Sequence, residues 1–441
     1  MSNRLKDSGR KIVESFSKLI PPIYRQDAAV KRSIYKWLLV GLLIRLIIMP
    51  ITVYFPDLLG IYLRSSLIAY QGVVWIGKFQ AAIHYIHAFF LWIFKPFMPY
   101  FSAILSNPQM RGDPTWGMFT VFVNNLFVFR TLFIFKLPYL IFELGCVFVL
   151  LGIFQDSKKG LRAFKFWMIN PVVIFATYFA ARYEVIAIFF ILLSLYYAKN
   201  NFSRRSLLCL GLAIVIRFYP LILLPFFVVI LERKLWRRLE LIFWGLVPLG
   251  IITVLGKLFS GKNEVSTLLG MHHSDFPLSM GFHLGFVGDY VFIFPLAFTL
   301  LLLYTYFYTD HSFANLWKST LVLLLTFFAT CFFHAHYFMW LMPFLVLQMA
   351  EDKRFLKLFG IQVLCFVVYI FQWKKAFFGQ LLAPISPSYF LSLPSPFEII
   401  NQYYPTGQFI GIFRSIFSGV CFWMVYLLFK EISLKAKRGR E

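Results

Sequence analysis

Long apolar segments, separated by short polar and basic stretches, run along most of the chain. The first predicted span covers residues 37–55, and the next covers 130–154. Further spans are predicted at 239–257, 289–309, 319–334, 336–350, 355–371 and 409–429. A helix of about 20 apolar residues crosses a bilayer, and a helix satisfies its own backbone hydrogen bonds there. The pattern therefore predicts an all-α, polytopic transmembrane bundle.

Two further apolar stretches, 164–198 and 206–231, are too long for one span and too short for two ordinary ones. Polar breaks at 182–184 and 217–220 interrupt them, and basic residues bound both ends of each stretch. We therefore expect each stretch to turn back at its break as a hairpin of short helices. Such helices are tolerated at membrane depth where they line a cavity or pack against protein. With these hairpins the chain would cross the membrane about twelve times.

Composition and charge placement agree with a membrane location. The chain is 60% hydrophobic and carries a net charge of +24. Most of the Lys and Arg residues fall in clusters between the apolar segments that would share one side. This is the distribution of the positive-inside rule, which places both termini in the cytoplasm. The basic residues form no separate stripe away from the spans, so nucleic acid is not an expected partner. Anionic lipid head groups are an expected partner.

Three regions are predicted along the chain. Residues 1–36 form a basic cytoplasmic segment without the features of a signal peptide, 37–345 form a catalytic transmembrane core, and 346–441 form C-terminal helices and a basic tail. The core includes a long outer loop, 56–129, in which the apolar piece 79–100 is expected to be a re-entrant or interfacial helix. The alternative, a further span there, would place the basic cluster that follows residue 154 outside. The late outer loop 372–408 is rich in Pro and Ser and is expected to be irregular.

Ionisable residues gather on the predicted outer side, where several distant segments would deliver them to one face. Because a charge in the bilayer is costly, each one is a candidate functional residue. Asp57 follows the first span and is either a solvated flank or a general base. Arg182 and Glu184 are either a phosphate clamp with its partner or a structural ion pair. Arg217 would meet a lipid phosphate or hold two short helices together near Pro220.

Histidine and cysteine give no metal site in this sequence. The pairs His272-His273 and His334/His336 lack the spacing of three or four ligands, because sequence neighbours do not share a helix face. We expect these histidines to serve substrate hydroxyls or phosphate instead. The five cysteines lie in apolar segments and are predicted to be buried free thiols. No Walker, Rossmann or nucleophile-elbow pattern is present, and no cofactor is expected.

Five segments in order resemble polytopic glycosyltransferases of the C superfold. The matching segments are Asp57 with Tyr62 and Gly72, the run 136–143, Trp167 with Asn170-Pro171 and then 182–184, the run 217–220 with Pro225, and the run 334–343. The closest similarity is to mannosyltransferases of the GPI-anchor pathway and their bacterial relatives. The chain departs from the family pattern, because an acid beside Asp57 is missing, Arg217 replaces Lys and Glu143 replaces Asp.

The resemblance implies a sugar-transfer reaction on the outer or lumenal side. A sugar, with mannose favoured, would pass from a polyprenyl- or dolichyl-phosphate donor to a lipid or glycan acceptor hydroxyl with inversion. Asp57 would be the general base. The implied substrate-binding residues are Tyr62, Arg64, Arg182, Glu184, Arg217, Tyr219, His272, His273, His334 and His336. The alternatives are a transporter or flippase of a polyprenyl-linked or anionic substrate and a glycan polymerase or ligase. A bacterial cytoplasmic membrane is favoured over the endoplasmic reticulum.

Overall fold

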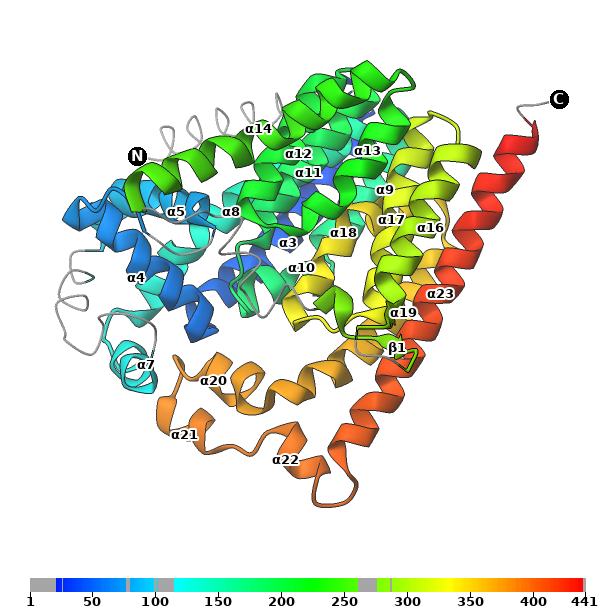
Figure 1. Ribbon diagram of the computed structural model, residues 1–441. Helices are drawn as coiled ribbons and strands as arrows, with labels where there is room; N and C mark the ends of the chain where they lie inside the picture. Colours follow the sequence, from blue (N-terminus) through cyan, green and yellow to red (C-terminus); the bar gives the residue numbers. More distant parts are fainter. Residues whose placement is uncertain are drawn as a thin grey trace.

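The fold is a bundle of helices of very different lengths (Figure 1). A computed structural model describes residues 21–25, 27–76, 80–98, 101, 115–260, 276–285 and 288–438. Its longer helices are α3 (Ala28–Ile51), α4 (Phe55–Gln71), α5 (Ala81–Phe94), α8 (Val128–Ile153), α9 (Ser157–Met168), α11 (Glu184–Lys199), α12 (Ser203–Ile216), α14 (Leu235–Ser260), α16 (Ile293–Tyr308), α17 (Phe313–Thr330), α18 (Met342–Glu351), α19 (Arg354–Tyr369) and α23 (Thr406–Arg438). The expectation of an all-α membrane protein is confirmed in this outline.

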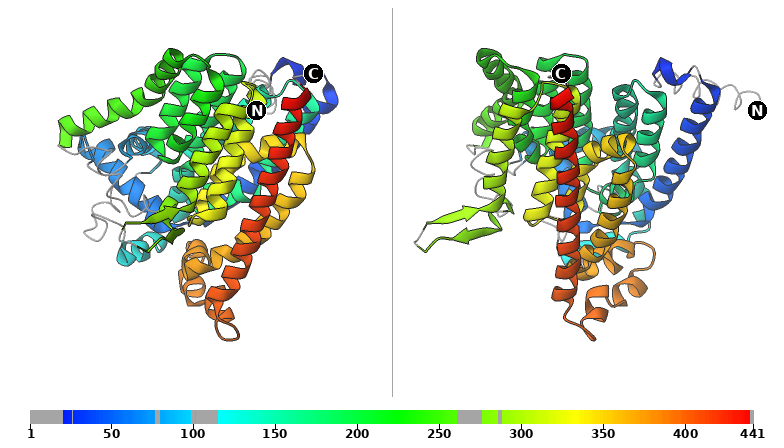
Figure 2. Two further views of the ribbon diagram at one scale, coloured as in Figure 1. Left: turned by 45° about the vertical axis from the view of Figure 1, so that its right-hand side comes forward. Right: turned by 90° about the vertical axis from the view of Figure 1, so that its right-hand side faces the viewer.

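Short elements connect these helices or break them. They are α2 (Pro22–Arg25), η1 (Lys95–Phe97), α7 (Trp116–Val123), α10 (Pro171–Ile174), the π-helical turn η3 (Phe175–Phe179), η4 (Tyr219–Leu223), α13 (Leu224–Leu231), η6 (Ala335–Leu341), η7 (Ile370–Phe377), α20 (Gly379–Leu382), α21 (Pro387–Ser392) and α22 (Pro396–Ile400). The strands β1 (Gly281–His283) and β2 (Tyr290–Phe292) pair antiparallel, with Phe282 opposite Val291. Figure 2 shows this small hairpin projecting from the helical body.

One end of the bundle gathers the basic clusters, and we call it the basic end. Ion pairs join its helices. Lys159 at the start of α9 contacts Glu351 at the end of α18 at 2.6 Å, and Lys318 in α17 contacts Glu431 in α23 at 2.7 Å. The opposite end, here called the outer end, carries α20 to α22 (Figure 1). The first polar break lies near it, because Arg182 pairs with Asp57 and the nearby Val53 N–H donates to the Leu381 carbonyl of α20. The separation of the ends agrees with the charge asymmetry along the sequence.

Both predicted hairpins turn back at their polar breaks. The first limb of the first hairpin consists of α9, α10 and η3. Asn170 caps α10 by accepting a hydrogen bond from the Val172 N–H at 2.9 Å. After the turn at 180–183, α11 returns, and Ser194 of α11 bonds Ser206 of α12 at 3.0 Å. The second hairpin breaks after Ile216, because the chain approaches Pro220, which has no N–H to continue a helix.

Among the residues that the structure describes, six helices are long and apolar enough to cross a membrane. They are 28–51, 128–153, 235–259, 313–330, 354–377 and 406–432. The expected count of about twelve crossings is not confirmed, because the remaining membrane-depth segments are short or interrupted. The chain is a multi-pass membrane protein on the evidence of these six apolar helices.

Two loops contain more helix than the sequence pattern predicts. The loop after α3 holds α4, α5 and α7, although one helix at 79–100 was expected. The helix α4 begins with Pro56 in its first turn and ends at Gly72, which adopts a φ of 68° suited to glycine. In the loop 372–408, α21 and α22 each begin with a proline that follows a serine, so the expectation of an irregular loop is wrong there.

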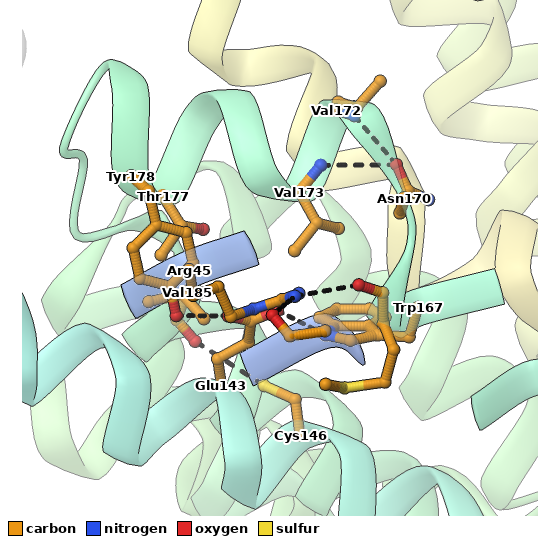
Figure 3. A network of polar contacts seen from close by, with 12 residues as sticks. Arg45, Glu143, Cys146, Trp167, Asn170, Val172, Val173, Thr177, Tyr178 and Val185 are labelled. Carbon is orange, nitrogen blue, oxygen red and sulfur yellow. Dashed lines mark hydrogen bonds and ion pairs between the residues drawn. The ribbon is translucent and has the colours of Figure 1, made fainter. Parts of the chain in front are cut away.

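A buried polar network locks α3, α8, α9 and η3 together (Figure 3). Arg45 of α3 donates from Nε to Glu143 of α8 at 2.8 Å and from Nη1 to the Met168 carbonyl at 2.8 Å. Glu143 also accepts from the Trp167 indole N–H at 3.2 Å and from the Tyr178 hydroxyl. Because every carboxylate oxygen has a donor, this network is a structural joint rather than an open site.

Candidate functional site

A cluster of charged and aromatic side chains lies at the outer end, where the two hairpin tips meet. Glu184 is the first residue of α11, and Arg217 is the residue that ends α12 in an extended conformation. Asp57 comes from the first turn of α4, and His336 comes from η6. We call this set, together with Arg182, the outer cluster. Four separate segments of the chain therefore converge on one place, as the sequence analysis expects.

Glu184 is at the centre of the outer cluster. Its side chain is 0% exposed and forms an ion pair with the Arg217 guanidinium. The Nε2 atom of His336 lies 3.5 Å from Glu184 Oε1, and Nε of Arg182 lies 3.6 Å from Oε2. A buried carboxylate is tolerated when cations and hydrogen-bond donors surround it. Glu184 thus holds two hairpin tips and η6 together, as the structural ion-pair alternative describes.

Asp57 is paired with Arg182. The Arg182 guanidinium contacts a carboxylate oxygen of Asp57, and the Asp57 side chain remains 33% exposed. Asp57 also stands in the first turn of α4, where the helix dipole favours a negative charge. Arg182 therefore bridges Asp57 and Glu184, and the sequence analysis did not predict this bridge. Among the cluster acids, Asp57 is the one with access to solvent.

Gln80 and Tyr183 complete the contacts of Arg217. Gln80 accepts a hydrogen bond from Arg217 Nη1 at 3.3 Å and another from the Tyr183 hydroxyl. The guanidinium of Arg217 lies 4.6 Å from the centre of the Tyr183 ring, a cation–π contact. Sequence reasoning missed Gln80, because an uncharged residue in a loop carries no signal of membrane burial. Its φ of 63°, uncommon outside glycine, was equally invisible.

Stacked aromatic rings form one wall of the outer cluster. The Tyr219 ring stacks on Trp340 at 4.0 Å between centroids, and Tyr337 stacks on the same indole at 4.1 Å. Within the part of the chain that the structure describes, Tyr219 Oη, Trp340 Nε1 and Arg217 Nε are buried without a hydrogen-bond partner. A buried donor without an acceptor costs about 1–3 kcal/mol. All three can donate, so the cluster is suited to a ligand rich in oxygen acceptors.

The other predicted site residues fall in different surroundings. Tyr62 lies in the core of the α4–α8 contact, where its ring stacks on Phe135 at 3.8 Å and its hydroxyl donates to the Phe135 carbonyl. Arg64 lies near His84 of α5. His334 is half-buried and stacks on His336 at 5.7 Å, so it borders the outer cluster. His272 and His273 lie outside the described residues.

The described residues offer no metal centre and no exposed thiol. Across the described ranges, no group of three or more His, Cys, Asp or Glu side chains is placed to hold a metal ion. All five cysteines are free and buried. The outer cluster sets Arg182 and Arg217 against Asp57 and Glu184, so the charges of these four side chains balance. Such an arrangement can orient a polar ligand through hydrogen bonds without attracting one strongly by net charge.

Comparison with known proteins points to a different function from the one expected. Residues 154–331 match the family model described as GPI transamidase subunit PIG-U. This match includes α9 to α17 and so contains Arg182, Glu184, Arg217 and Tyr219. No curated protein matches the chain.

The match overturns the interpretation as a glycosyltransferase of the C superfold. A transamidase replaces the amine that is bonded to an acyl group, and it neither transfers a sugar from a lipid phosphate nor moves a lipid across the membrane. The mannosyltransferase and flippase interpretations are therefore both wrong. The polyprenyl- or dolichyl-phosphate sugar donor is therefore no longer an expected partner. The role of Asp57 as base in sugar transfer falls with that reaction, and its carboxylate is engaged by Arg182. The preference for a bacterial membrane loses its support, because it rested on the same resemblance.

Proposed function

We propose that this protein is a membrane subunit of a GPI-transamidase complex, which joins proteins to a glycolipid anchor. The observation that carries the proposal is the family match over residues 154–331. That segment supplies both hairpin tips of the outer cluster, with Arg182, Glu184 and Arg217. The proposal favours the endoplasmic reticulum membrane as the location.

Another subunit supplies the nucleophile in this proposal. Transfer of an acyl group between amines commonly passes through an acyl-enzyme on an activated Cys or Ser. The cysteines of this chain are buried among apolar side chains, where burial and the lack of access make a thiol inert. The protein therefore holds substrate and partners in place rather than performing the bond exchange.

The outer cluster receives the polar head of the glycolipid in this proposal. The unpartnered donors of Tyr219, Trp340 and Arg217 support it, because sugar hydroxyls and phosphate oxygens accept hydrogen bonds. Asp57 is the entrance residue, since its side chain is one-third exposed while Glu184 is fully buried. His336 in η6 and His334, which immediately precedes η6, line the same site.

The membrane arrangement in this proposal retains the expected topology. The six long apolar helices, the two hairpins of short helices, the shorter helix α16 and the η6–α18 segment together would give about twelve crossings, with both termini on the cytoplasmic side. The region 37–345 carries the outer cluster, and the helices after residue 345 flank it.

Isolation of the complex tests the proposal. Epitope-tagged protein, extracted in a mild detergent, is compared with the same chain purified alone, using a reporter with a C-terminal attachment signal and added glycolipid. The complex is expected to convert the reporter to its anchored form, and the chain alone is expected to be inactive. Conversion by the chain alone, or isolation of the chain solely as a monomer from its native membrane, would contradict the proposal.

A matched pair of variants connects the activity to the site. Tyr219→Phe removes a buried hydroxyl of the outer cluster that has no hydrogen-bond partner among the described residues, and Tyr35→Phe removes a similar hydroxyl from α3. Conversion is expected to fall for the first variant in the assembled complex and to persist for the second. Equal conversion by both would remove the outer cluster from the function.

A further inference from the structure

A groove at the basic end lies between the starts of α12 and α14. Its volume is about 500 Å³, which falls within the range of pockets that hold small ligands. Its charged lining residues are Arg204, Arg205, Arg237, Glu232 and Glu240. Its apolar lining residues include Leu208, Leu241 and Trp244. The groove therefore offers both charged and apolar side chains to a ligand.

The guanidinium groups of the groove contact neighbouring side chains. Glu240 uses one carboxylate oxygen for Arg204 and the other for Arg237, the latter at 3.1 Å. Both arginines remain more than half exposed, at 62% and 57%, so their other N–H groups face solvent. Arg205 lies over the Phe202 ring at 4.9 Å. Three arginines thus lie together along the groove, and a guanidinium group can bind two phosphate oxygens at once.

The acids of the groove leave it with a small positive charge. Backbone hydrogen bonds from Lys234 and Arg233 lower the pKa of Glu232, so this carboxylate is ionised at neutral pH. Three arginines and two glutamates give the lining a net charge of +1. A ligand with one net negative charge would be complementary to this lining.

The position of the groove identifies the source of that anion. The candidate span 235–259 begins beside it, and Leu235 and Trp236 are 68% and 82% exposed. Trp is enriched where a helix enters the head-group layer of a bilayer. We therefore expect the arginines of the groove to lie at head-group level.

We propose that this groove binds one acidic phospholipid of the cytoplasmic leaflet, with the phosphate at Arg204, Arg205 and Arg237. The glycerol and first acyl carbons contact the apolar lining residues. This binding is separate from the proposed transamidase role, because the groove is at the basic end and the outer cluster is at the opposite one.

Measurement of retained lipid tests the proposal. The purified protein is delipidated and placed in nanodiscs of phosphatidylcholine with a small fraction of phosphatidylinositol or phosphatidylserine. Tightly bound lipid is then counted by native mass spectrometry. The intact protein is expected to retain one acidic lipid. Arg205→Gln combined with Arg237→Gln is expected to weaken this retention roughly tenfold or more, because each basic residue at the surface adds to the attraction.

Two further variants separate a site from general surface charge. Lys158→Gln removes an exposed basic residue at the same end but away from the groove and is expected to change nothing. Leu208→Trp fills the groove, keeps every charge and is expected to abolish retention. Equal loss with Lys158→Gln, equal retention of phosphatidylcholine, or equally tight binding of inorganic phosphate would each overturn the proposal.

Discussion

The Arg217 guanidinium, which ends α12, is paired with the Glu184 carboxylate, which begins α11, and both side chains are more than nine-tenths buried. This single ion pair joins the tips of the two hairpins. Because Glu184 also faces Arg182 and His336, its removal would leave buried cations without a counter-charge.

Neutralising Glu184 is therefore expected to destabilise the protein strongly. Breaking a buried pair by removing one partner costs about 3–5 kcal/mol, whereas an exposed pair contributes less than about 1 kcal/mol. Glu184→Gln should lower the free energy of unfolding in mixed micelles by an amount in the first range. The control Glu240→Gln, in the partly exposed pair with Arg204, should change it little. Equal effects of the two would show that the outer cluster is not a structural joint.

Close packing of α12 against α14 depends on Gly211. A Cβ atom at this position would lie 2.4 Å from the Gly245 carbonyl oxygen, so the helices would have to separate. Gly211→Ala is expected to destabilise by about 1–3 kcal/mol, the usual cost of overpacking. Gly250→Ala on α14 meets nothing within 4 Å and should stabilise slightly, because Ala favours a helix by about 1 kcal/mol. Opposite signs in the two unfolding free energies are the expected result.

The Arg45–Glu143 pair should show strong energetic coupling. Each single substitution, Arg45→Met or Glu143→Leu, leaves a buried charge without its partner. The double variant removes both charges. Glu143→Leu and the double variant both lose the acceptor for Trp167 and Tyr178, so this loss cancels in the cycle. A double-mutant cycle on unfolding free energy is expected to give a coupling of about 2–3 kcal/mol. Simple additivity would argue against the network in Figure 3.

Acid is expected to weaken the packing of α5, which is not one of the six candidate spans. Burial lowers the pKa of His87 from 6.5 to about 4, so the folded state binds fewer protons than the unfolded state between these values. The stability from the neutral ring is full above pH 6.5 and is lost as the pH falls toward 4. His87→Gln should reduce the pH dependence of unfolding in this window, and an unchanged dependence would contradict the burial of a neutral ring.

The sequence correctly predicts the helices that coincide with long apolar runs and the turns that coincide with charged residues inside such runs. The polar breaks at 182–184 and 217–220 located both hairpin turns, because an ion at membrane depth is rare enough to be a strong signal. The helix α4 was missed, since its apolar residues occur in an amphipathic pattern rather than in one run. The helices α21 and α22 were missed because Pro was taken as a loop signal, whereas Pro after Ser also begins a helix.

The site was predicted as a set of charged residues but not as a set of contacts. Asp57, Arg182, Glu184, Arg217 and His336 do converge, yet their pairing depends on turn geometry that no local pattern encodes. Gln80 and Trp340 were missed because neither is ionisable. The functional interpretation was wrong for a related reason. The motifs behind it, such as an Asp after the first span and Pro within later helices, reflect how the helices of polytopic bundles turn and pack. Bundles with similar packing catalyse different reactions, so these motifs do not identify the reaction.

Comparing glycolipids and a reporter protein in cells with and without this chain tests the central claim most directly. The measurement is the fraction of a secreted reporter attached to its lipid anchor, together with mass spectrometry of the free glycolipids. Loss of the chain is expected to leave the reporter unattached while complete, amine-bearing glycolipid accumulates, and the wild-type gene should restore attachment. Normal attachment without the chain, or accumulation of glycolipid that lacks a sugar, would contradict a role in transamidation.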